Sequence, residues 1–173
     1  LYVDPFLLWK SDASLDTSLH GTLVDSFNYL GALYSKGDEA EAMDILISAS
    51  ECSEVGLGTS SNKIGKRIGK TSANQILSLF KDIPQLKECG FTHFEEIQLL
   101  VEGISKDRIS DISCSLLSNF LIDYTQDQCI RHGIPMSMVK TEIFDPKQKK
   151  FILNPKELPI NPKTVSYTHL RAH

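Results

Sequence analysis

Hydrophobic side chains recur every three or four residues along several stretches of the chain, which is the spacing of one buried helix face. The longest such stretch runs from Ser105 to His132. Its apolar positions are Ile109, Ile112, Leu116, Leu117, Phe120, Leu121 and Tyr124. We expect this stretch to form one long helix whose stripe lies in the core.

Two further stretches predict a pair of helices near the N-terminus. An apolar face runs through residues 18–36, and Lys36-Gly37 is typical of a helix end. A second helix should begin at Asp38, with Glu41 in the capping-box position. Because the connecting turn is short, the two helices should pack antiparallel.

The remaining periodic segments are shorter. Residues 71–86 predict a third helix that ends near Pro84, whereas residues 96–101 fit a helix or a buried strand equally well. The N-terminal segment around Trp9 suits an edge strand or a docking arm.

A β-hairpin is predicted after residue 135, because two apolar runs flank the turn-like sequence Asp145-Pro146-Lys147. Three Asn-Pro or Leu-Pro pairs follow and predict an extended linker. The expected fold is therefore mainly α, in the α+β class. A domain of about five helices spans 1–135, and the hairpin and linker span 136–164.

The last nine residues, 165–173, have a different character. The sequence VSYTHLRAH resembles the translation of an adapter used to prepare sequencing libraries. This resemblance implies that 165–173 are not biological and that the natural protein continues beyond Thr164.

The composition is that of an ordinary globular chain, with 41% hydrophobic and 23% charged residues. No apolar run approaches the roughly 18–20 residues that a membrane helix needs. The four cysteines form no C-x-x-C pair, so they are expected to be reduced thiols of a cytoplasmic protein.

The net charge of −4 hides an uneven distribution. Acidic residues dominate 1–54, where Lys10 and Lys36 are the only bases. The segment 55–81 contains no acid and five bases: Lys63, Lys66, Arg67, Lys70 and Lys81. An acidic body beside one basic segment indicates a local contact with an anion.

The basic segment is also rich in glycine, which predicts a phosphate-binding loop. The expected phosphate-binding residues are Lys63, Lys66, Arg67, Gly69, Lys70 and Thr71. GKRIGKT differs from a nucleotide P-loop because Ile64 stands where the first glycine belongs. The segment resembles a helix-hairpin-helix element more closely, which implies contact with the DNA backbone, although Arg67 replaces a glycine of that pattern. A solvated loop without a ligand is the alternative.

The start of the Ser105–His132 stretch carries the candidate catalytic residues Asp107, Arg108 and Asp111. Carboxylates at i and i+4 can share a divalent cation with a phosphate, so Asp107 and Asp111 are candidate ligands of Mg²⁺ in a nuclease-like hydrolase. The alternative is structural: Ser105 or Asp107 caps the helix, and Arg108 pairs with a neighbouring acid.

The stretches DPFLLW, KDRISDI and GIP resemble the N-terminal part of a group of uncharacterised bacterial proteins. That resemblance implies an association with restriction or phage defence and assigns no residue roles. We therefore expect a protein that binds or acts on DNA, with a non-catalytic helical interaction module as the alternative. If the fold brings the glycine loop to the first turn of the Asp107 helix, the two candidate sites become one.

Overall fold

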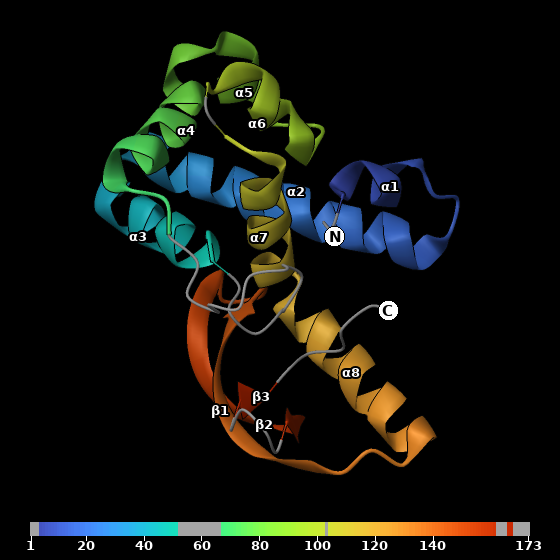
Figure 1. Cartoon of the computed structure of the whole chain (residues 1–173). Coiled ribbons are helices and arrows are strands. Elements are labelled where there is room, and N and C mark those ends of the chain that lie inside the picture. Colours follow the sequence, from blue (N-terminus) through green and yellow to red (C-terminus); the bar gives the residue numbers. More distant parts are fainter. Residues whose placement is uncertain (1–3, 52–66, 103, 162–165, 168–173) are drawn as a thin grey trace.

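The computed structural model describes residues 4–51, 67–102, 104–161 and 166–167. Its first five helices are α1 (Pro5–Lys10), α2 (Ser14–Lys36), α3 (Glu39–Ala49), α4 (Lys70–Asp82) and α5 (Pro84–Cys89). A 3-10 turn (Phe94–Glu96) leads into α6 (Ile97–Leu100), α7 (Lys106–Leu116) and α8 (Ser118–His132). The strands are β1 (Met136–Asp145), β2 (Lys150–Asn161) and β3 (Ser166–Tyr167). The mainly helical α+β class is confirmed (Figure 1). The short helices α1, α5 and α6 raise the number of described helices above the expected five.

The pair α2–α3 forms as expected, and the two helices pack against each other. Gly37 ends α2 in the left-handed conformation, at φ 109°, and its N–H donates to the carbonyl of Tyr34 at 3.2 Å. Asp38 precedes α3 but its side chain makes no capping hydrogen bond, so the predicted capping box is wrong.

The stretch Ser105–His132 is two helices rather than one. The chain bends at Leu117, between α7 and α8. The hydroxyl of Ser118 accepts the N–H of Phe144 at 3.0 Å, and the amide of Asn119 donates to the Phe144 carbonyl at 2.8 Å. The bend thus presents the first residues of α8 to the backbone of β1.

The β-hairpin is confirmed and is longer than expected. Its antiparallel ladder runs from Met136 opposite Pro159 to Asp145 opposite Lys150. Part of the segment expected to be a linker therefore belongs to β2. Proline is tolerated in a strand where its nitrogen faces away from the partner strand. Pro155 and Pro159 are four residues apart and so share one orientation in the ladder.

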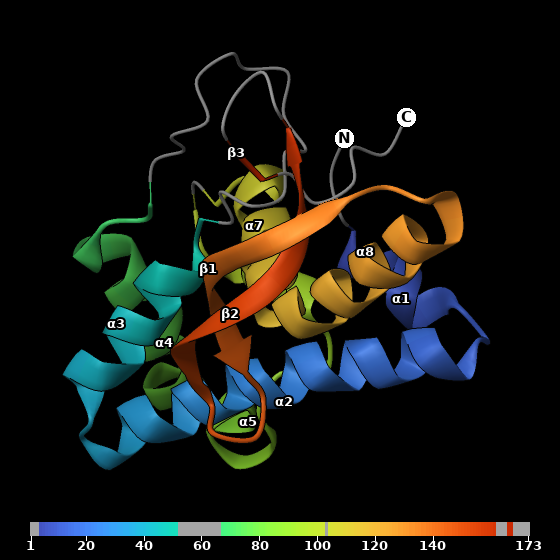
Figure 2. The same ribbon diagram turned by 90° about the horizontal axis from the view of Figure 1, so that it is seen from below.

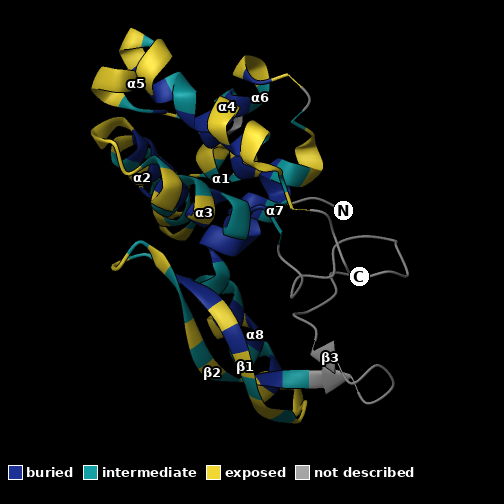
Figure 3. Ribbon diagram, turned by 90° about the vertical axis from the view of Figure 1, so that its left-hand side faces the viewer, coloured by how far each residue is buried: buried dark blue, intermediate teal, exposed yellow. Residues whose placement is uncertain are grey.

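The helices enclose one main core, and α8 covers a smaller one (Figure 3). At the centre of the main core, Phe27 meets the rings of Phe80, Phe91 and Phe94 with centroids 5.1–5.7 Å apart. The smaller core consists of Ile122, Ile143 and Leu158, with Val139 and Ile152 packed against it. The hairpin packs along α8 and also contacts α3 and α7 (Figure 2).

The N-terminal segment is a docked helix rather than an edge strand. Asp4 caps α1 by accepting the N–H of Phe6 at 3.0 Å, and Pro5 occupies the first helical position. Trp9 lies against His93, with ring centroids 4.2 Å apart. Across the described ranges, no helix has both the length and the apolarity to cross a membrane.

Candidate anion-binding pocket

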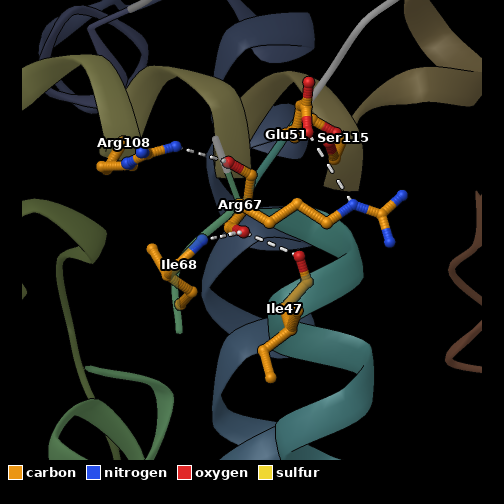
Figure 4. Close-up of polar contacts among 7 residues, drawn as sticks. Ile47, Glu51, Arg67, Ile68, Arg108 and Ser115 are labelled. Atoms are coloured by element: carbon orange, nitrogen blue, oxygen red, sulfur yellow. Dashed lines mark hydrogen bonds and ion pairs between the residues drawn. The ribbon is translucent and has the colours of Figure 1, made fainter. Parts of the chain in front are cut away.

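Ser50, the buried residue that ends α3, joins two segments that are distant in the sequence. Its hydroxyl accepts the N–H of Ile68 at 3.0 Å and donates to the carbonyl of Ile47 at 2.7 Å. The segment that leads into α4 is thereby fixed to the end of α3 (Figure 4). The carbonyl of Ser50 in turn lies 3.5 Å from Nη1 of Arg108, on α7.

Local structure positions Arg108 at this junction. Ser105 is the N-cap of α7, and its hydroxyl lies 3.4 Å from the N–H of Arg108. The capping role proposed for Ser105 is therefore confirmed. The guanidinium approaches the last carbonyls of α3, where a positive charge is favourable. On the same side of α7, the Ser115 hydroxyl donates to the carbonyl of Glu51 at 3.4 Å.

Arg67 reaches the same junction from the other side. Its Nε lies 3.9 Å from Oε2 of Glu51, and its side chain remains 52% exposed, against 17% for Glu51. An ion pair this long and this open to solvent contributes little to stability. The Arg67 guanidinium is therefore accessible to a ligand.

A pocket of about 210 Å³ lies between these elements. Its lining residues are Arg67, Ile68, Gly69, Ser72, Gln75, Val101, Glu102, Ile104 and Arg108. They come from the segment that leads into α4, from the first half of α4, from the segment between α6 and α7, and from α7 itself. The described end of the glycine-rich segment, Arg67 to Gly69, and Arg108 in the first turn of α7 thus line one pocket.

The N-terminus of α4 strengthens the positive character of the pocket. Gly69 is the N-cap and supplies no capping side chain. The first N–H groups of a helix have no partner within that helix, and the helix dipole is positive at this end. The charged residues of the lining are Arg67, Arg108 and Glu102, and the Arg67 guanidinium is directed toward Glu51, away from Arg108 (Figure 4). The arrangement suits a small anion such as a phosphate.

The predicted phosphate-binding residues divide into three groups. Arg67 and Gly69 line the pocket. Lys70 and Thr71 are exposed in the first turn of α4, beside the pocket lining. Lys63 and Lys66 lie outside the described residues.

The predicted catalytic residues do not all reach the pocket. Arg108 lines it, whereas Asp107 is exposed and Asp111 is half-buried outside the lining. The pKa of Asp111 is raised to about 6, first by burial and then by the charges of Asp107 and Glu51, while the charge of Arg108 acts in the opposite direction. In the parts of the chain that the structure describes, no group of three or more His, Cys, Asp or Glu side chains could hold a metal ion. The Mg²⁺ site stays a prediction.

Sequence reasoning missed Ser50 and Glu51, because a serine and an acid at a helix end have many ordinary roles. Gln75 was detectable in principle. Residues 69, 72 and 75 are spaced by three, so Ser72 is a helix neighbour of the predicted Gly69 and Gln75 is a helix neighbour of Ser72.

The fold and the pocket define a small, mainly helical α+β protein with a cavity between α4 and α7 whose lining includes two arginines. The chain belongs to the family described as Domain of unknown function (DUF8370), whose model matches residues 1–168. No curated protein and no solved structure matches the chain. The resemblance to an uncharacterised family is therefore confirmed, and the adapter-like origin of 165–173 stays a prediction.

Proposed function

We propose that this protein binds DNA by holding a backbone phosphate in the pocket between α4 and α7. The observation that carries the proposal is the meeting of Arg67 and Arg108, which are far apart in the sequence, in one cavity at the start of α4. Guanidinium groups match the geometry of phosphate oxygens, and helix N-termini add oriented N–H donors.

The character of the binding follows from the lining. Phosphate contacts position a protein on DNA and carry no sequence information. Binding should therefore tolerate any sequence and weaken steeply with salt. The whole chain has a net charge of −4, so its surface outside the basic segment is acidic and should confine contact to this patch.

The biological setting in this proposal is a bacterial cytoplasm and a role in phage defence. It is supported by the sequence resemblance alone. The pocket supports binding, while hydrolysis would further require Asp107 and Asp111 to act with Mg²⁺ on the bound phosphate.

The test is a salt titration of binding to short duplex and single-stranded DNA, followed by fluorescence anisotropy. We expect Arg67→Gln and Arg108→Gln each to weaken binding several-fold and to reduce the salt slope by about 1. Arg131→Gln is the matched control, because Arg131 is exposed in the last turn of α8, outside the pocket lining. It should bind like the wild type.

Two outcomes would overturn the proposal. One is the absence of DNA binding at low salt, which would favour the helical interaction module. The other is an equal loss of DNA affinity in Arg131→Gln and in the two pocket variants. Because Arg108 also contacts the carbonyl of Ser50, thermal melts must show that its variant is folded. Arg67→Gln is the safer variant, since its only recorded ion pair among the described residues is the long one to Glu51.

A further inference from the structure

We infer that the outer edge of β1 pairs with β1 of a second copy of this chain. The two strands run antiparallel about a two-fold axis at Thr141, so that Lys140 of each copy lies opposite Glu142 of the other. Three features of the hairpin support this pairing: the direction of its backbone groups, the course of α8 and the order of the charges along β1.

The backbone of β1 directs its hydrogen-bonding groups alternately toward β2 and away from it. The N–H and the carbonyl of Phe144 bond to side chains at the start of α8, so Phe144 faces away from β2. In an antiparallel ladder every second residue has the same orientation. Glu142, Lys140 and Met138 therefore also direct their N–H and carbonyl groups to the outer edge of β1.

The helix α8 covers this edge only at its first turn. Asn119 bonds to Phe144 at the edge of β1, whereas Gln126, about two turns later, donates to the carbonyl of Glu157 in β2 at 3.0 Å. The helix thus crosses the hairpin from β1 to β2. Lys140 and Glu142 are exposed, and in the part of the chain that the structure describes no other element hydrogen-bonds to their backbone. This part of the edge is open to another strand.

The opposite edge, on β2, is blocked along residues 150–159. Pro155 lies opposite Lys140 and Pro159 lies opposite Met136, so both proline nitrogens face the outer edge of β2. A proline nitrogen carries no hydrogen, and proline on an edge strand is a common protection against pairing with another chain. β1 contains no proline. The hairpin therefore has one protected edge and one unprotected edge.

The charges of β1 favour a second copy as the partner. Lys140 and Glu142 lie on the same face of the strand, on either side of Thr141. With the two-fold axis at Thr141, opposite charges meet at both positions. An axis at Lys140 or at Glu142 would place like charges directly opposite each other, which is destabilising. The favourable register also brings the outward backbone groups of Lys140 against those of Glu142 of the second copy, so the backbone and side-chain matches coincide.

Sedimentation equilibrium of the 173-residue chain, across a series of protein concentrations, tests the pairing. We expect a weak dimer, because the ladder is short: it ends at Phe144, whose backbone groups already bond to α8. Lys140→Glu and Glu142→Lys should each raise the dissociation constant roughly tenfold or more, since two attractive pairs become two repulsive ones.

Two rescue experiments fix the register. A mixture of the Lys140→Glu and Glu142→Lys proteins should associate again, because the acids of one variant then face the lysines of the other. The double variant, with both substitutions in one chain, should dimerise like the wild type, because opposite charges again meet across the axis. General charge attraction explains the first result but not the second.

Two further variants separate the edge from the rest of the hairpin. Glu157→Lys makes the same change of charge at an exposed position of β2 and should dimerise like the wild type. Lys140→Pro removes an outward N–H without removing a hydrogen bond to β2, and should weaken the dimer. Thermal melts by circular dichroism check that each variant is folded. If the proline unfolds the strand, the exposed charge variants still decide.

Three outcomes would overturn the inference. A wild-type chain that is monomeric at every concentration would leave the edge of β1 for a different strand or for none. A dimer that neither charge reversal weakens would lie on another surface. A dimer that both reversals weaken, but that the double variant does not restore or that Glu157→Lys weakens equally, would not pair Lys140 with Glu142.

Discussion

Asp111 links the stability of the protein to pH through one side chain. Its folded-state pKa is about 6, raised by burial and then by the charge of Asp107, whereas an aspartate in an unfolded chain titrates near 4. Between about pH 4 and pH 6 the folded state therefore binds more protons than the unfolded state. The free energy of unfolding must fall as the pH rises through this window, which is the reverse of the usual effect of an aspartate.

Replacing Asp111 with asparagine removes this penalty. We expect Asp111→Asn to be more stable than the wild type by about 1 kcal/mol at pH 7.5, a value reduced for the partial exposure of the carboxyl. At pH 4.5 the gain should be much smaller. Urea unfolding at both pH values measures the difference. Asp127→Asn, at an exposed position of α8, is the control. A gain for Asp111→Asn that is equal at both pH values would contradict the argument.

The close approach of α2 and α4 depends on the absence of a side chain at Gly31. Gly31 is buried in α2, and a Cβ built there would overlap the ring of Phe80 on α4. The same ring contacts Phe27 and Phe91 at centroid distances of 5.7 and 5.2 Å, so it has little room to move. The helix pair is therefore packed to fit a glycine.

We expect Gly31→Ala to destabilise the protein by about 1–3 kcal/mol, the usual cost of overpacking a core. This cost outweighs the gain of up to about 1 kcal/mol from replacing glycine within a helix. Gly21→Ala is the control in the same helix, because a Cβ there meets nothing within 4 Å. It should stabilise the protein slightly. Thermal or urea unfolding of both variants measures the two changes in stability. If both variants change stability in the same direction, the packing argument is wrong.

Apolar periodicity predicted the helices whose formation depends on the local sequence. Leu23, Phe27 and Leu30 define the buried face of α2 in the sequence and are fully buried in the structure. The bend at Leu117 was not predictable in this way, because the contacts that accompany it come from Phe144 in a different element. The basic segment and Arg108 were both recognised from the sequence. Their meeting in one pocket involves Ser50, whose hydrogen bonds are tertiary.

At the scale of the whole molecule, Phe144 joins the hairpin to the helices. It is fully buried and belongs to the main core, whereas its neighbour Ile143 belongs to the smaller core under α8. Its ring meets Phe151 at a centroid distance of 5.4 Å. Lys149, in the hairpin turn, also reaches the hydroxyl of Ser26 on α2 at 3.3 Å. These contacts tie the two cores together, while the division of the chain at residue 135 stays a prediction.

We therefore expect the hairpin and the helices to unfold in one transition. Trp9 is the only tryptophan of the chain and lies on α1, so its fluorescence reports the helical part, whereas far-UV circular dichroism reports all elements. The two signals should coincide in urea. Phe144→Ala should lower the stability by about 3–5 kcal/mol in both signals.

The control is Leu153→Ala, at a side chain of the hairpin that is 70% exposed, which should change stability by less than about 0.5 kcal/mol. If Phe144→Ala shifts only the circular dichroism and leaves the Trp9 transition in place, the hairpin is a separate folding unit. Coincident shifts would instead mean that one side chain of β1 supports the helices that form the pocket.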